Sequence, residues 1–451
     1  MNTKYDFADQ NFKIECCKMM LSKGGETSLS LEGPGEIWQD HEGVLQYKIF
    51  LNEESFLSLG DLQFRSFPPG QLIKDDDFFT LHARDISLPV WVGPQIIPNA
   101  RGGLHEGLAH GRLSELIQEE PYPEEAEFDV VLLRFKGRIE FPSNRGTETV
   151  VKVGGQKRST SHTLNVAFVD VAGFTFEMRH EREHTVASLR LPAGTATAAT
   201  PSRIQEALQF VLGQQLAVMV VETMEAGQHL TRLTSPSHGH GKRPPPLQFR
   251  SLDFDGNFWR MFTDYFLHVH ADSESGWHPT SCHVGSVIES AAASLDIGVL
   301  ALSVAVEGLA GESFLALVPD NPELLNDLDK VKKTVDGMTL SETALNRIVG
   351  ALGAMKSPRK SDALRAFITH NNMPAGLYKS WSSLRNMSAH GSMARGNNIE
   401  QLLRLKYEVL SLFYSLVFAT INYKGPRIDY SLSGWPVQDW PIPQQPEKAN
   451  K

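Results

Sequence analysis

Residues 235–246 read Ser-Pro-Ser-His-Gly-His-Gly-Lys-Arg-Pro-Pro-Pro and separate two regions with different hydrophobic patterns. Because glycine and proline interrupt both helices and strands, this composition is typical of a linker. Before the linker the sequence alternates like an antiparallel β domain, and after it apolar residues recur at helical spacing. We therefore predict an α+β multidomain fold: a β-rich domain over residues 1–246, an all-helical bundle over 247–430, and a tail over 431–451.

In the first region, Gly and Pro separate short runs in which apolar and polar residues alternate. The region 101–127 is acidic and predicts a long surface loop with one short helix at 113–118. A longer helix is expected at 200–213, where Thr200 is a suitable N-cap and Pro201 occupies the first turn. The predicted strands are 12–15, 27–32, 44–51, 88–92, 128–141, 162–171, 185–191 and 216–221.

In the second region, five or more antiparallel helices with short connections predict a bundle. The tail carries Trp435 and Trp440 among prolines. It either straps onto the protein surface, which we favour, or recognises a partner. The predicted helices are 257–270, 284–309, 321–335, 341–355, 361–371, 374–390 and 398–423.

The 451 residues, of which 41% are hydrophobic and 21% charged, have the composition of a globular protein with two or three domains. The most apolar window, 288–309, is interrupted by Glu289, Asp296 and Glu307, so it predicts a buried helix and no membrane contact. The N-terminus lacks the apolar segment of a signal peptide. A cytoplasmic location is expected.

The 3 cysteines cannot build a disulfide framework, which indicates a reducing compartment. For the adjacent Cys16 and Cys17 we favour a strand residue and its neighbour over a metal clip. No cofactor is predicted. A metal site is an alternative for a second group, but its spacings match no zinc signature, and surface or helix-end histidines are favoured. That group comprises His268, His270, His278, His283 and Cys282.

Charge is unevenly distributed along the chain. Residues 340–430 contain 12 Lys and Arg against 5 Asp and Glu, a balance of +7, so the remainder of the chain carries −10 − 7 = −17. A locally basic region within an acidic protein suits a phosphate-binding surface. The alternative is a set of ordinary solvated helix faces.

Residues 381–391, Trp-Ser-Ser-Leu-Arg-Asn-Met-Ser-Ala-His-Gly, lie in this basic region. The helix predicted from residue 374 delivers Arg385 and Asn386 in its last turns, followed by His390 and a glycine suited to a helix end. Asn386 and His390 are four apart, so the amide can orient the imidazole. The negative end of the helix dipole raises the pKa of His390 toward the physiological range.

The Arg-to-His spacing alone is weak evidence for a catalytic motif, because an arginine is followed five positions later by a histidine three times in the sequence. Arg179 and His184 lie between two strand-like runs, which predicts a charged hairpin tip. Arg365 and His370 lie on a short amphipathic helix, and no polar residue follows the arginine. Only Arg385 combines the asparagine, the helical approach and the terminal glycine.

The pattern Leu-Arg-Asn-x-x-Ala-His-Gly resembles the HEPN superfamily, whose ribonucleases carry an arginine, a polar residue and a histidine. A β-rich region followed by such a bundle is similar to the ApeA-type anti-phage defence proteins. The resemblance implies a metal-independent endoribonuclease with Arg385 and His390 as catalytic residues and Asn386 in support. It also implies a homodimer through the bundle with a composite site, transfer RNA as one RNA target, and an N-terminal domain that responds to a phage component in abortive infection.

Elementary chemistry points the same way. RNA cleavage without a metal needs a base for the 2′-hydroxyl proton, an acid for the leaving 5′-oxygen and a cation beside the phosphorane. His390 and Arg385 suit these roles, but one histidine per chain is too few, so a two-fold dimer is expected. DNA lacks the 2′-hydroxyl nucleophile. The alternative is a non-catalytic HEPN-like module for dimerisation or nucleotide binding, in which Arg385 and His390 only cap the helix.

Overall fold

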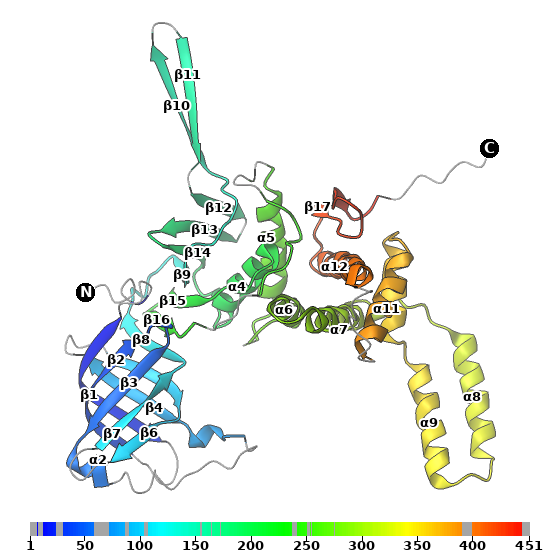
Figure 1. The fold of residues 1–451 in the computed structure, drawn as a ribbon, viewed down its shortest axis with the longest axis horizontal. Helices are drawn as coiled ribbons and strands as arrows, with labels where there is room; N and C mark the ends of the chain where they lie inside the picture. Colours follow the sequence, from blue (N-terminus) through cyan, green and yellow to red (C-terminus); the bar gives the residue numbers. More distant parts are fainter. Residues whose placement is uncertain are drawn as a thin grey trace. The chain divides into compact units, whose positions relative to one another are not determined.

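The computed structural model describes residues 7, 12–23, 30–57, 72–85, 90–102, 107–153, 156–163, 165–171, 173–236, 241–249, 253, 255–274, 276–389 and 399–443. The chain divides into two units. The first consists of Met1–Gln205, Leu216–Gly239 and Phe249–Gly256, and the second of Glu206–Gln215, His240–Gln248 and Asn257–Lys451. A β-rich N-terminal region is therefore followed by helices, as the hydrophobic pattern predicts (Figure 1).

The first unit is built on antiparallel strands. In the described part of the chain, 14 of them form one sheet in the order β12-β13-β14-β9-β15-β16-β8-β5-β4-β1-β2-β3-β7-β6, while β10 and β11 pair separately. The strands are β1 (Lys13–Lys23), β2 (Ser30–Gln39), β3 (Leu45–Leu51), β4 (Phe79–Asp85), β5 (Val90–Ile96), β6 (Asn99–Gly102), β7 (Gly107–Leu113), β8 (Glu115–Pro121), β9 (Phe128–Phe135), β10 (Gly146–Val153), β11 (Gln156–Thr163), β12 (Val166–Val171), β13 (Phe174–Glu181), β14 (His184–Pro192), β15 (Val218–Glu225) and β16 (Gln228–Thr234).

Alternation along each strand places apolar side chains in a shared interior. On β3, Leu45, Tyr47 and Ile49 are fully buried, whereas the residues between them are not. Because successive side chains point to opposite faces of a strand, one face of β3 lies on the core. Figure 1 shows β1 to β8 curling around this interior, and their buried residues form one hydrophobic cluster.

The adjacent cysteines occupy a β-bulge, where the pairing register of β1 shifts between Cys16 and Met19. Cys16 is buried and Cys17 is exposed, so the two thiols do not face the same side. Burial raises the pKa of the Cys16 thiol to about 12, which disfavours the thiolate that a metal requires. The prediction of a strand residue and its neighbour is confirmed.

The prediction of a loop and a short helix in region 101–127 is wrong, since β7 and β8 occupy most of it. On β7, Ala109, Gly111 and Leu113 face the core, and Gly111 is small because the Tyr47 ring lies only 2.9 Å from the position of a Cβ atom. The glutamates of β8 make this segment resemble a loop in the sequence. It is a strand nevertheless, because it pairs with β16, which is distant along the chain.

The second unit contains most of the helices. Phe210 stacks on Tyr265 with ring centroids 4.6 Å apart, and the Tyr414 and Phe418 rings also lie against it. This aromatic cluster joins α4, α5 and α12. The helices of the chain are α2 (Glu53–Leu57), η1 (Asp75–Asp77), α4 (Thr200–Leu212), α5 (Asn257–His270), α6 (Pro279–Glu289), η2 (Ser290–Ala292), α7 (Leu295–Ser313), η3 (Leu315–Leu317), α8 (Pro322–Asp336), α9 (Glu342–Lys356), α10 (Lys360–His370), α11 (Gly376–Ala389) and α12 (Ile399–Thr420). No helix in the described ranges is long and apolar enough to cross a membrane.

The single helix predicted at 284–309 is in fact two helices, α6 and α7, separated by η2. Buried Arg243 fills this break: its guanidinium donates to the carbonyls of Val287 and Gly298 and to the Ser290 hydroxyl. The last carbonyls of a helix have no intrahelical partner, and at the end of α6 the remote Arg243 donates to one of them, that of Val287. The apolar pattern carries no signal of that cation.

The C-terminal segment packs on the second unit. Strands β17 (Gly425–Ile428) and β18 (Val437–Trp440) pair with each other, and Trp440 is buried against Phe367 and Phe418. Arg427 also lies beneath the Trp440 ring. The prediction of a strap is thus confirmed as far as residue 443.

Candidate active site at the end of helix α11

Helix α11, which carries the predicted catalytic motif, is fixed between α7 and α12. The Trp381 indole donates to the Ser303 carbonyl at 3.0 Å, and Leu384, three residues further on, is fully buried. On the α12 side, the Ser380 hydroxyl donates to Glu408. Residues three and four apart share a helix face, so these anchors fix the rotation of α11 about its axis.

Arg385 lies one turn before the end of α11 and forms an ion pair with Glu307 of α7. The Arg385 Nε atom donates to Glu307 Oε2 at 2.5 Å, with the two side chains 40% and 28% exposed. A guanidinium has five N–H donors, and within the described ranges no other polar partner of Arg385 is present. One carboxylate thus holds the group through Nε, and among the described residues the Nη atoms have no polar partner.

Asn386, the supporting residue, is exposed on the same last turn. His390 lies just beyond the described end of α11, together with residues 391–398. The expected pairing of Asn386 with His390 on one helix face therefore lies outside the described residues and stays a prediction.

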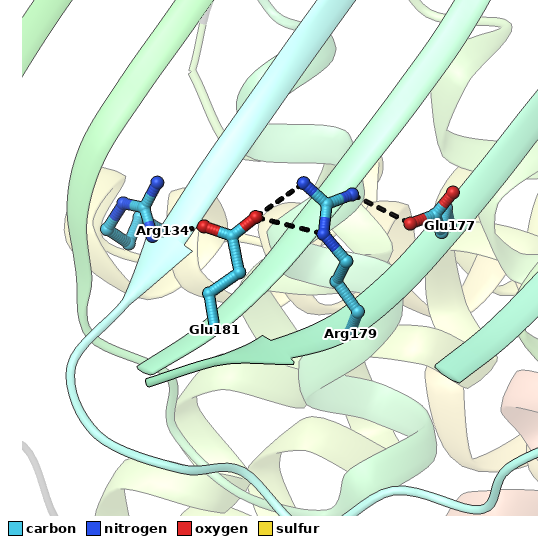
Figure 2. Close-up of polar contacts among 4 residues, drawn as sticks. All are labelled: Arg134, Glu177, Arg179 and Glu181. Carbon is cyan, nitrogen blue, oxygen red and sulfur yellow. Dashed lines mark hydrogen bonds and ion pairs between the residues drawn. The ribbon is translucent and has the colours of Figure 1, made fainter. Parts of the chain in front are cut away.

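The first competing motif is in the β-rich unit, where Arg179 and His184 belong to the hairpin of β13 and β14, as predicted. Arg179 donates to Glu177 and twice to Glu181, at 2.5 to 2.9 Å, and Arg134 also binds Glu181 (Figure 2). Two carboxylates therefore surround Arg179. It is an arginine neutralised within a sheet, a poor ligand for a phosphate.

The second competing motif lies on α10. The Arg365 guanidinium stacks on the Tyr378 ring of α11 at 4.3 Å, which is a cation–π contact. His370 is exposed at the C-terminal end of α10. Arg365 thus braces α10 against the start of α11.

The histidines considered as metal ligands have other partners. The His278 ring caps α6 by accepting from the Thr280 amide, and His283 contacts Glu312 at 3.0 Å. His268 is close to the Thr280 hydroxyl, and burial lowers the pKa of its imidazole, which favours the neutral ring. Within the described ranges, no group of three or more potential metal ligands comes together.

Glu307 is the site residue that sequence reasoning did not identify. In the sequence, Glu307 is an acidic residue that interrupts the apolar window 288–309, and in the structure it lies on α7. A carboxylate within an apolar helix is costly unless it is paired, which is the signal that could have marked it. Its partner lies 78 residues away, and no local pattern predicts that contact.

Comparisons with known proteins assign no function to this site. No family model matches it, and neither a curated protein nor a solved structure matches it.

Proposed function

We propose that the protein is a metal-independent endoribonuclease in which Arg385 and His390 perform the chemistry and Asn386 supports the histidine. The observation that carries this proposal is the half-exposed guanidinium at the end of α11, oriented by Glu307 through Nε alone. A planar guanidinium binds two phosphate oxygens at once, and the Nη edge, which has no partner among the described residues, is suited to that contact. Neither competing arginine has a comparable environment.

The proposed reaction is an attack of the ribose 2′-oxygen on the adjacent phosphorus. A histidine accepts the hydroxyl proton, a new P–O bond forms, the bond to the 5′-oxygen breaks, and a second histidine protonates the leaving oxygen. Arg385 stabilises the charge that develops on the phosphate. The products are a 2′,3′-cyclic phosphate and a 5′-hydroxyl.

The need for two histidines calls for a homodimer with a composite site. An exposed apolar stripe on α7, formed by Ile297, Leu300 and Val304, supports one. These residues share a helix face, and Val304 is three positions from Glu307. A second copy packed on this stripe comes close to Arg385. Exposed apolar surface of this kind is typical of an interface.

The biological role that we propose is anti-phage defence by abortive infection. Constitutive cleavage of host RNA, including transfer RNA, harms the cell, so the activity requires control. In this proposal the β-rich unit holds the helical unit inactive until a phage component binds. The support for this part is the layout of a β-rich region before the helices and the resemblance of the motif.

The test is incubation of the purified full-length protein with total RNA in EDTA, alone and with extract of phage-infected cells. We expect cleavage by the parent and losses of about 10²- to 10⁴-fold in Arg385→Ala and His390→Ala. Arg365→Ala is the matched control, since it removes an arginine with the same spacing, and its rate should remain within about twofold of the parent. Thermal unfolding of each variant checks that it is folded.

Two outcomes contradict the proposal. Either the Arg385→Ala and His390→Ala variants cleave RNA as fast as the parent, or the parent is inactive under both conditions. The second outcome favours a non-catalytic module in which the two residues only cap α11.

A further inference from the structure

Within the described part of the second unit, helices α8 and α9 form a hairpin without a covering layer (Figure 1). All residues of the hairpin are described, and only Leu328, Val335 and Leu352 are buried in it. A helix pair needs a further apolar surface to bury its seam, because two short helices bury too little on their own. Large apolar side chains remain exposed, namely Leu324, Leu325, Val331, Met338, Leu340, Ile348 and Met355.

A cavity of about 460 Å³ lies at the base of the hairpin, where α8 begins and α9 ends. Its apolar lining includes Leu324, Leu325 and Met355, and Arg359 lies at its edge. The Asp362 carboxylate, also in the lining, accepts from the Arg359 amide as part of the cap of α10. The lining is therefore mixed: apolar side chains lie beside the cations Lys356 and Arg359 and the carboxylates Asp320 and Asp362.

The opposite end of the hairpin has the complementary features. Met338 and Leu340, 52% and 40% exposed, stand in the turn between α8 and α9. Acidic residues flank them, with Asp336 at the end of α8 and Glu342 at the start of α9. The tip thus presents apolar side chains beside carboxylates, which can contact the apolar side chains and the Arg359 guanidinium in the lining of the recess.

The charges along α8 are also segregated. Its first half carries Glu323, Asp327 and Asp329, and its second half carries Lys330, Lys332 and Lys333 before Asp336 at its end. Two such helices placed antiparallel bring opposite charges together. Over residues 322–356, five acidic residues balance five basic ones, so the surface does not suit nucleic acid or an anionic membrane.

We propose that the hairpin pairs with the same hairpin of a second copy of this chain, antiparallel about a two-fold axis. In such an isologous contact, each tip enters the base cavity of the partner, so every contact occurs twice. At 1.5 Å per residue, α8 is roughly 22 Å long, and the two ends engage together. The four helices then form a bundle layer that covers the exposed seam. This contact is independent of the proposed RNA cleavage.

The first test measures self-association of the full-length protein by sedimentation equilibrium. The combined Met338→Lys and Leu340→Lys variant places two cations beside Lys356 and Arg359 in the recess and should weaken association by about tenfold or more. Asn346→Glu, at an exposed position on the opposite face of α9 from Ile348 and Met355, is the control and should leave it unchanged. A monomeric parent, or a tip variant that associates like the parent, overturns the proposal.

The second test locates the contact by disulfide formation, in a background with the exposed Cys17 and Cys282 replaced by serine. A chain with Met338→Cys, mixed with one carrying Leu325→Cys, should give a disulfide that joins the two chains. A chain with Asn346→Cys in place of Leu325→Cys should react at least about tenfold more slowly, since distant thiols do not bridge. Equal rates with both partners overturn the antiparallel arrangement.

The third test uses charge exchange. Glu342→Arg and Arg359→Glu should each weaken association, whereas the two changes in one chain should restore it, because a two-fold contact places residue 342 of each copy beside residue 359 of the other. If the two losses of association simply add in the double variant, the hairpin contacts something other than a second hairpin. That result overturns the proposal.

Discussion

At the residue scale, the pair of Glu307 and Arg385 is better explained by orientation than by stability. Half-exposed ion pairs contribute only about 0.2–1 kcal/mol to folding. A carboxylate that accepts from Nε, however, fixes the plane of the guanidinium and leaves its outer edge toward solvent. Catalysis depends on such prior orientation, since a displaced group loses much of its effect on the transition state.

Replacement of the orienting carboxylate tests this role. Glu307→Gln should lower the RNA cleavage rate at saturating RNA by about tenfold, since a neutral amide holds the guanidinium less firmly. The free energy of unfolding should change by less than about 1 kcal/mol. The control is Glu312→Gln, because Glu312 lies on α7 like Glu307 and its carboxylate contacts His283. A loss of stability that accounts for the whole loss of activity contradicts an orienting role.

Sequence reasoning at this scale correctly placed Arg385 and Asn386 in the last turns of a helix, because the motif is local and the helix that carries them is amphipathic. It also separated Arg385 from Arg179 and Arg365. It did not identify Glu307, because the contact depends on how α7 packs on α11. Burial and pairing are properties of the fold, and the spacing of residues within one helix does not contain them.

At the scale of elements, strongly periodic helices were predicted well and long-range pairing was not. The predicted helix 257–270 coincides with α5. By contrast, β7 and β8 were assigned to a loop because their acidic and glycine residues disfavour strands locally. Pairing with β3 and β16 overrides that preference. The break between α6 and α7 was not predicted for the same reason, because Arg243, whose guanidinium fills the break, is distant from both helices in the sequence.

The packing of α5 on α6 should be sensitive to pH. Burial lowers the pKa of His268 in the folded protein below its usual value of 6.5. As the pH falls below 6.5, this imidazole therefore takes up a proton in the unfolded chain before it does so in the folded protein. Stability should therefore be complete above pH 6.5 and fall as pH drops from there toward the folded pKa. His278 lies beside the ring and is left unchanged.

Urea unfolding at pH 7.5 and 5.5 measures this effect. The loss of stability on acidification should be smaller in His268→Gln than in the parent, whereas His370→Gln, at an exposed position, should behave like the parent. An equal pH dependence of parent and His268→Gln contradicts the assignment.

At the scale of the whole molecule, the proposals use two separate surfaces for self-association. The α7 stripe brings two copies of the site together, and the α8–α9 hairpin joins copies through another two-fold contact. Two different isologous contacts on one chain build assemblies larger than a dimer. The helical unit would then support both catalysis and higher assembly.

Val304→Glu separates the two contacts. A charge in the α7 stripe should lower RNA cleavage by about 100-fold by separating the two copies of the site. The disulfide between the hairpin positions 325 and 338 should still form. Leu267→Glu, an equally exposed apolar position on α5, is the control and should retain activity. Full activity of Val304→Glu contradicts a composite site at this stripe.

The central claim is that a guanidinium and an imidazole at the end of α11 cleave RNA without a metal. The most direct measurement is the chemistry of the new RNA ends formed in EDTA by the parent and by His390→Ala. The account predicts 2′,3′-cyclic phosphate and 5′-hydroxyl ends that appear with the parent and disappear with the variant. Ends with a 3′-hydroxyl and a 5′-phosphate, or cyclic phosphates that persist in His390→Ala, would contradict it.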